Sequence, residues 1–303
     1  MSTKNNEPDD DMMLCCASCG VAEGDDIKLK MCTACKSVRY CSVACQRDHR
    51  PKHKKSCKKR AAELRDEILF RQPESSHVGD CPICLLPLPI DPRKSTMQSC
   101  CSKSICNGCV YTNQMREAKE NLQHTCPFCR YPLQETQAGH EILLMKRVKA
   151  NDPEALCFMS TRRYKEGDYD SAIAYWTKAA ELGHAEAHFQ LSTMYRNGNG
   201  VEKDEKKELH HMTEAAISGH PEARHNLSSH EGRRGRYERA AKHLIIAANL
   251  GDDDSVGKLR ILYESGIVSK EDFATALRAH QAAVDATKSP QREEADAFFQ
   301  NKV

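Results

Sequence analysis

The chain has 303 residues, a formal net charge of +2 and a hydrophobic fraction of 39%. This length predicts two or three domains, and no apolar stretch approaches the roughly 20 residues that a membrane-spanning helix requires. The small net charge does not by itself indicate nucleic-acid binding. We therefore expect an intracellular protein, cytoplasmic or nuclear, without membrane association; a nuclear factor that binds nucleic acid through its basic residues is a weaker alternative.

Cysteine is the most informative residue type, because sixteen of the 17 cysteines lie within the first 129 residues. Most of them occur as closely spaced pairs, and two thiolates on one tight turn can reach one tetrahedral ion. A disulfide framework is the alternative. The start of the chain, Met1 to Glu7, has no apolar secretory core, which favours a reducing compartment and bound zinc.

Residues 1–13 are acidic and polar, and we expect a disordered tail there. The first cysteine cluster follows at residues 14–60 and offers eight ligands for two ions. About 45 residues cannot bury a sufficient apolar core, so metal binding must supply much of the folding free energy. The eight positions are Cys16, Cys19, Cys32, Cys35, Cys41, Cys45, His53 and Cys57.

The string from Cys32-Thr-Ala-Cys35 through Arg39-Tyr40-Cys41 and Cys45-Gln46 to His53 and Cys57 resembles the MYND zinc finger. The resemblance implies interleaved ligands: Cys16, Cys19, Cys41 and Cys45 for one zinc, and Cys32, Cys35, His53 and Cys57 for the other. Cys15 is an alternative to Cys16. MYND fingers are protein-interaction modules that often dock proline-rich peptides near the residue matching Gln46. Arg50 stands at the usual Trp position and removes the aromatic platform, so a purely structural zinc module is the alternative.

A basic run from Arg47 to Arg60 overlaps the end of this cluster. It is typical of the solvated face of a helix, and a nuclear localisation signal or a phosphate-binding patch is the alternative. Residues 61–79 form a helical linker in our prediction. Leu64, Ile68 and Leu69 share one helical face, and the helix ends before Pro73.

The second cluster occupies residues 80–135 and again provides paired thiols. Its opening Cys81-Pro-Ile-Cys84 and closing Cys126-Pro-Phe-Cys129-Arg130 resemble a RING finger. Lys103 stands where that family has its fourth ligand, and a protonated lysine has no lone pair for zinc. Cys100 is the first candidate to replace that ligand and His124 the second. The ligand sets implied by the resemblance are Cys81, Cys84, Cys106 and Cys109, and then Cys100, Cys101, Cys126 and Cys129.

RING fingers that act as ubiquitin ligases orient a ubiquitin-charged conjugating enzyme and contribute no nucleophile. The resemblance implies that Ile83 and Pro127 contact that enzyme and that the Arg130 guanidinium bridges to ubiquitin. The stretch between Cys109 and Cys126 lacks the Trp often found at this contact. A RING-like structural finger without ligase activity is the alternative.

Residues 139–288 contain a repeated sequence motif. A short motif begins at positions 151, 183, 219 and 251, so successive starts differ by 32, 36 and 32 residues. Small residues, large apolar residues and Ala-Ala pairs recur at fixed places, which predicts paired helices with a Gly C-cap. The strings AAELGHAEA and YRNGNGVEKDEKK resemble Sel-one-like repeats, relatives of the tetratricopeptide repeat. Histidines here, among them His184, His210, His211, His220 and His225, are expected to be surface or capping residues. Residues 289–303 are expected to form a tail.

The predicted fold is multidomain, with two small zinc-stabilised cross-brace fingers followed by an all-α solenoid. A solenoid of this kind presents a concave surface to a protein partner. The predicted function is a RING-type ubiquitin-protein ligase or ligase-like adaptor whose repeats select a protein substrate. The alternative is a non-enzymatic zinc-finger scaffold for protein–protein interaction. Four zinc ions are expected, two per finger.

Overall fold

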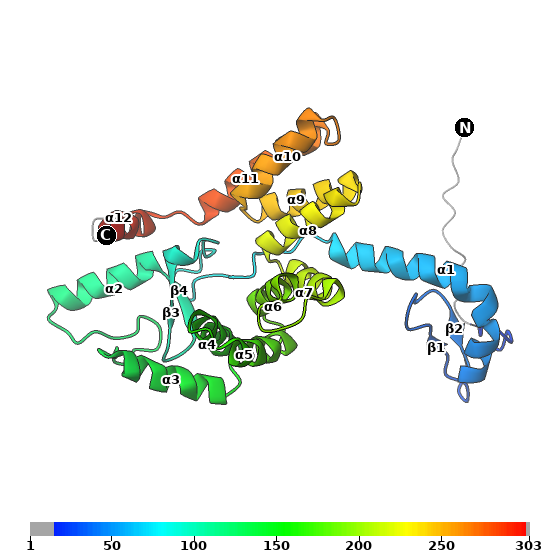
Figure 1. The fold of residues 1–303 in the computed structure, drawn as a ribbon, viewed down its shortest axis with the longest axis horizontal. Helices are drawn as coiled ribbons and strands as arrows, with labels where there is room; N and C mark the ends of the chain where they lie inside the picture. Colours follow the sequence, from blue (N-terminus) through cyan, green and yellow to red (C-terminus); the bar gives the residue numbers. More distant parts are fainter. Residues whose placement is uncertain (1–14, 301–303) are drawn as a thin grey trace. The chain divides into compact units, whose positions relative to one another are not determined.

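The computed structural model describes residues 15–300, and the chain divides into two compact units between Arg71 and Gln72. Each unit is described by itself. The first contains one thiol-rich finger, and the second contains the other finger followed by helical repeats (Figure 1). This confirms the predicted class of two fingers and a helical solenoid. The tail expected at residues 1–13 lies outside the described residues.

The first unit is a small hairpin with one long helix. Strands β1 (Lys30–Met31) and β2 (Arg39–Tyr40) are antiparallel, with Lys30 opposite Tyr40. Helix α1 (Val43–Leu69) begins after Ser42, whose hydroxyl accepts a hydrogen bond from the Cys45 amide. The helix expected in the 61–79 linker is therefore the C-terminal part of a helix that starts inside the finger.

The second finger opens the second unit and is built on a hairpin and a helix. The 3₁₀ turn η2 (Pro92–Lys94) leads into the antiparallel strands β3 (Ser95–Gln98) and β4 (Lys103–Cys106). Helix α2 (Asn107–Lys119) follows directly, because Cys106 is both the end of β4 and the N-cap of α2. The hairpin and the helix thus help to gather four stretches of cysteines around one small core.

The rest of the second unit is helical, and consecutive helices of each repeat pack as antiparallel pairs (Figure 1). The pairs are α4 with α5, α6 with α7, and α8 with α9. The helices are α3 (Gln137–Lys149), α4 (Pro153–Lys165), α5 (Tyr169–Glu181), α6 (Ala185–Asn197), α7 (Glu205–Ile217), α8 (Pro221–Arg233), α9 (Tyr237–Asn249), α10 (Asp253–Glu264), α11 (Lys270–Ala286) and α12 (Pro290–Gln300).

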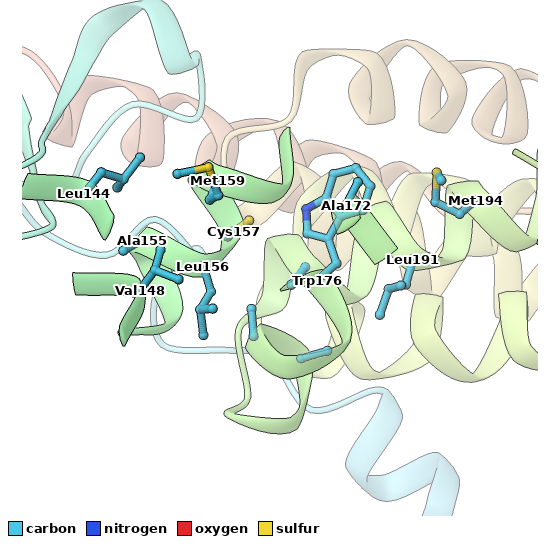
Figure 2. Packing of buried hydrophobic residues seen from close by; sticks show 13 residues of the cluster. Leu144, Val148, Ala155, Leu156, Cys157, Met159, Ala172, Trp176, Leu191 and Met194 are labelled. Atoms are coloured by element: carbon cyan, nitrogen blue, oxygen red, sulfur yellow. The ribbon is translucent and has the colours of Figure 1, made fainter. Parts of the chain in front are cut away.

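The recurring columns of the sequence are the core of this solenoid. The small column (Ala155, Ala187, Ala223, Ser255), the large apolar column (Met159, Leu191, Leu227, Leu259) and the three Ala-Ala pairs are buried. Alanine pairs allow the helices to approach closely, while the large residues fill the space between pairs. Trp176 on α5 is also buried, and it belongs to the same cluster as Ala172 and Leu191 (Figure 2).

Each repeat begins with a capped helix, and the capping residue explains two of the histidines. The side chains of Asp152, His184, His220 and Asp252 accept backbone N–H bonds at the starts of α4, α6, α8 and α10. Such caps satisfy the unpaired amides of a first helical turn. His184 and His220 are therefore capping residues, as the sequence predicts.

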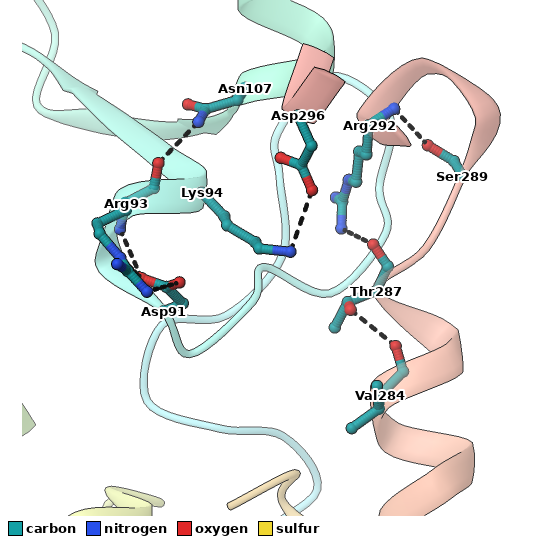
Figure 3. Close-up of polar contacts among 9 residues, drawn as sticks. All are labelled: Asp91, Arg93, Lys94, Asn107, Val284, Thr287, Ser289, Arg292 and Asp296. Carbon is teal, nitrogen blue, oxygen red and sulfur yellow. Dashed lines mark hydrogen bonds and ion pairs between the residues drawn. The ribbon is translucent and has the colours of Figure 1, made fainter. Parts of the chain in front are cut away.

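Residues 289–303 were expected to be a tail, but residues 290–300 form α12, which packs against α2 of the second finger. The contact is polar as well as apolar. Lys94 forms an ion pair with Asp296 at 3.0 Å, and Tyr111 packs on Phe298 (Figure 3 shows the polar part). A C-terminal segment rich in charged residues does not reveal such docking, because its partner lies almost 200 positions away.

Hydropathy gives the described part of the chain one further property. Between residues 15 and 300, every helix is too short or too polar to cross a membrane.

Candidate metal centres and partner-binding surfaces

The first finger brings its predicted ligands together in two sets of four. One set is Cys16, Cys19, Cys41 and Cys45, and the ligand atoms within it all lie within 4.8 Å of one another. Cys41 Sγ is 3.6 Å from Cys19 Sγ and 3.5 Å from Cys45 Sγ. Cys15 is not in the set. It pairs instead with Ala22 as an isolated β-bridge.

The other set of the first finger combines the hairpin with helix α1. Cys32 and Cys35 come from the turn between β1 and β2, while His53 and Cys57 lie one turn apart on α1. Residues four apart share a helix face, so both can reach one ion. Cys35 Sγ is 3.3 Å from His53 Nε2, and Cys32 Sγ is 3.8 Å from Cys57 Sγ.

The second finger also gathers two sets of four, and they interleave along the chain. Cys81 and Cys84 meet Cys106 and Cys109, whereas Cys100 and Cys101 meet Cys126 and Cys129. The facing sulfur atoms are 3.4 to 3.9 Å apart. Pairing the first and third stretches, then the second and fourth, is the cross-brace expected from the sequence.

These separations fit zinc and do not fit disulfides. A tetrahedron with Zn–S bonds of about 2.3 Å has edges of about 3.8 Å, which agrees with the sulfur separations in all four sets. A disulfide requires about 2.05 Å, and all cysteines of the described residues are free thiols. The four sets are therefore compatible with zinc. Ligation by each named residue remains a prediction.

The pKa values of the thiols in the second finger also favour a bound cation. The hydrogen bond with Cys106 lowers the pKa of Cys81 to about 4, and the same bond raises the pKa of Cys106 far above its usual range. Four crowded thiols thus resist ionising together unless a positive charge compensates them. A bound zinc ion supplies that charge and holds all four as thiolates.

Local backbone geometry explains how adjacent Cys100 and Cys101 reach the same ion. The Cys101 and Ser102 amides both donate to the Gln98 carbonyl, and Ser102 has a φ of 55°. This tight turn directs both thiols to one side. Lys103, at the position of the usual fourth ligand, is exposed at the start of β4.

His124, the second candidate for that ligand, has another partner. Its side chain is 62% exposed, and its Nδ1 lies 3.2 Å from a carboxylate oxygen of Glu117. Glu117 itself is buried on α2 and accepts hydrogen bonds from Asn113 and from the Thr125 amide and hydroxyl. Burial alone raises the pKa of Glu117, but these bonds outweigh it and lower the pKa.

Sequence reasoning missed this Glu117 network, which fastens the loop after α2 to the helix. The sequence contains a signal for this network. Asn113 and Glu117 are polar, and they follow Cys109 on α2 by four and eight residues, so they lie on the same helix face. Positions on the ligand face of a helix are buried, so polar residues there need partners.

The C-terminal helix adds Arg292 to the second finger. The Arg292 guanidinium donates to the carbonyl oxygens of Pro87 and Leu86 and lies 3.4 Å from Cys84 Sγ. Burial lowers its pKa, but the neighbouring thiols Cys84 and Cys106 reverse this and raise it. Four thiolates around one divalent ion retain negative charge, so a guanidinium at this edge is favourable.

The three residues expected to contact a conjugating enzyme differ in accessibility. Ile83 is 41% exposed, whereas Pro127 is buried. The next residue, Phe128, is 44% exposed. The Arg130 side chain reaches back and donates to Asn113 Oδ1 at 2.9 Å. The accessible apolar residues of the two CxxC turns are thus Ile83 and Phe128.

Two family models match the chain. Residues 16–57 match the MYND finger, and residues 153–184, 185–220 and 221–252 each match the Sel1 repeat. Neither match covers the second finger. The Sel1 matches include three of the four capped repeat starts described above. Both module types indicate protein–protein interaction.

Relatives and solved structures are similar to parts of the chain. DAP3-binding cell death enhancer 1 of Mus musculus is 26% identical over 182 residues, 47% of this chain and 36% of that protein. Its counterpart from Rattus norvegicus is 23% identical over 208 residues, 55% of this chain and 40% of that protein. The chain therefore spans well under half the length of these relatives. A crystal structure of a Sel1 repeat protein from Oxalobacter formigenes is 23% identical with a TM-score of 0.42, covering 58% of this chain and 52% of that chain.

Proposed function

We propose that the chain is an adaptor that binds a protein on its Sel1 repeats and docks a ubiquitin-conjugating enzyme on its second, RING-like finger. The first part rests on the two matched module types. It is supported by the mouse relative, whose name describes binding to a protein, DAP3. The domain boundaries that we propose are those predicted from the sequence, with fingers at residues 14–60 and 80–135 and repeats at residues 139–288.

The observation that carries the second part is the completeness of the RING-like finger. Cys100 lies in a set of four thiols that could hold one ion without Lys103, and Ile83 with Phe128 leaves an apolar surface on the two CxxC turns. Arg130 follows the last ligand and is exposed, so its remaining N–H groups can donate to ubiquitin. No side chain has to act as a nucleophile, because the finger would accelerate transfer by orienting a charged thioester.

Binding of conjugating enzymes to the zinc-loaded full chain tests this proposal. We expect at least one enzyme of a panel to bind and to support ubiquitin chain formation. Ile83→Ala should reduce binding about tenfold or more, as burial of one large apolar side chain at an interface predicts. Leu85→Ala is the matched control, because Leu85 is 74% exposed two residues away and is not an expected contact.

Absence of binding across the panel, or equal losses in both variants, contradicts conjugating-enzyme docking. A non-enzymatic scaffold is then the better account. One observation favours this alternative: Pro127 is buried and Asn113 lies within a polar network on α2, which leaves a narrower apolar surface. An intracellular location is part of both proposals, because the finger thiols must remain reduced to bind zinc.

A further inference from the structure

A histidine–glutamate pair recurs between successive repeats. The Nε2 atom of His184, the cap of α6, lies 3.0 Å from a carboxylate oxygen of Glu154, and His220, the cap of α8, lies 2.9 Å from Glu186 in the same way. Each cap also accepts a long bond of 3.3 Å from a first-turn amide through its Nδ1. Taken alone, both pairs are ordinary contacts that fix one repeat to the next.

A third side chain joins the second pair. His77 comes from outside the repeats, and its ring stacks on that of His220 with centroids 4.0 Å apart and planes 16° from parallel. The ligand atoms of His77, Glu186 and His220 all lie within 4.8 Å of one another. Among residues 15–300, the His184–Glu154 pair has no third ligand of this kind.

The imidazole of His77 is poorly satisfied by the protein. Its side chain is only 10% exposed, and Nδ1 is buried without a hydrogen-bond partner in the described part of the chain. Nε2 is 3.7 Å from a Glu186 oxygen, which is too long for a hydrogen bond. Buried polar groups nearly always have a hydrogen-bond partner. The described residues provide none for His77 Nδ1.

We propose that His77, Glu186 and His220 form a site for a divalent metal ion of the zinc class, separate from the four finger sites. Two imidazole nitrogens and one carboxylate oxygen are a recognised ligand set for Zn²⁺, with one position left for water. Calcium and magnesium prefer oxygen ligands throughout, so they fit less well. An ion bound here gives the His77 imidazole a ligand bond where the described residues provide no hydrogen bond.

Coordination has a defined proton balance. The ion replaces the proton that His220 Nε2 shares with Glu186, and neutral His220 then carries its proton on Nδ1. The bond from the Ala223 amide to Nδ1 is given up in exchange, and at 3.3 Å it is a long one. No electron transfer or further reactant is involved.

The ion would fasten a connecting segment to the solenoid. Residues 72–79 precede the second finger, and the His77 amide already donates to the Gly219 carbonyl at 3.0 Å. At the other end of the segment, Asn249 donates to the Gln72 side chain at 3.0 Å. A metal bond from His77 to Glu186 and His220 joins this segment to two successive repeats at once.

Calorimetric titration of the full chain, its finger sites filled with zinc, tests the site with added Zn²⁺ alone. We expect one further equivalent in the unmodified chain and none in His77→Ala or Glu186→Gln. His184→Ala is the matched control and should keep the further equivalent, because the pair it disrupts lacks a third ligand. If the ion co-purifies, the same difference appears as one zinc fewer in His77→Ala by native mass spectrometry.

A second readout separates binding from folding. Hydrogen exchange in residues 72–79 should slow on adding Zn²⁺ to the unmodified chain, by at least tenfold, and remain unchanged in His77→Ala. No further equivalent in either metal measurement overturns the proposal. Retention of the equivalent in His77→Ala, or its equal loss in His184→Ala, overturns it as well.

Discussion

Replacing Arg292 with alanine tests how strongly the C-terminal helix stabilises the second finger. The buried guanidinium donates to the carbonyl oxygens of Pro87, Thr287 and Leu86 at 2.7, 2.7 and 3.2 Å. It also lies 3.4 Å from Cys84 Sγ. Each bond contributes about 0.5 to 1.5 kcal/mol net, and partial rehydration of the carbonyls offsets some of the loss. We expect the free energy of local opening to fall by about 3 kcal/mol.

Hydrogen exchange of the zinc-loaded full chain measures this quantity, because a multidomain chain does not have one global unfolding free energy. A loss of about 3 kcal/mol corresponds to roughly 100-fold faster exchange in α2 and in residues 84–90. Arg292→Lys should lie in between, since lysine retains the charge but not the planar fork. Zinc should also leave the site containing Cys84 faster on addition of a chelator.

Arg278→Ala is the control, because Arg278 is exposed on α11 and donates only to the nearby Thr275 hydroxyl among the described contacts. Its exchange should match that of the unmodified chain. Unchanged protection of α2 in Arg292→Ala would mean that α12 rests on the finger without stabilising it.

Three further predictions concern the second unit. Glu117→Ala should destabilise the second finger by about 2 to 4 kcal/mol, because it leaves several buried donors unpaired; exposed Glu120→Ala should have little effect in the same exchange experiment. Gly219→Ala should release residues 72–79 from the repeats, because Gly219 has a φ of +82° and a Cβ there would lie 2.7 Å from a backbone oxygen of that segment. Unchanged hydrogen exchange in residues 72–79 would contradict this prediction. Desolvation, with help from neighbouring histidines, lowers the pKa of His211 to about 4. The unfolded chain therefore takes up the proton first, and solenoid stability should fall by about 1 to 2 kcal/mol as pH drops from about 6.5 towards 4. Trp176 fluorescence during denaturation measures this, and an equal slope in His211→Gln contradicts it.

The grouping of the cysteines into four sets could be predicted because it depends on local spacing. Cysteines two or three residues apart share one turn, so spacing alone restricts which thiols can reach one ion. The choice of Cys100 over His124 was weaker, because it depends on the turn at Ser102 and on the partner of His124. Both are properties of the folded finger, and the structure brings Cys100 into the set.

The repeats could also be predicted from the sequence, because each is a local unit whose buried positions recur with the same spacing. Docking of α12 could not be predicted in this way, because it joins segments almost 200 residues apart. Burial of Glu117 could be inferred only from its spacing to Cys109, which places both residues on the same face of α2. The contacts of His77 could not be predicted either, since its partners lie more than 100 residues away on two different repeats.

A count of zinc ions by native mass spectrometry in His77→Ala, which lacks the further site proposed above, tests whether each finger is a complete cross-brace with two bound ions. Four ions per chain are expected in this variant. Adding Cys100→Ser should remove one ion and adding Cys15→Ser none, because Cys100 lies within a ligand set and Cys15 does not. Three ions in His77→Ala, or an undiminished count after Cys100→Ser is added, would contradict two complete fingers.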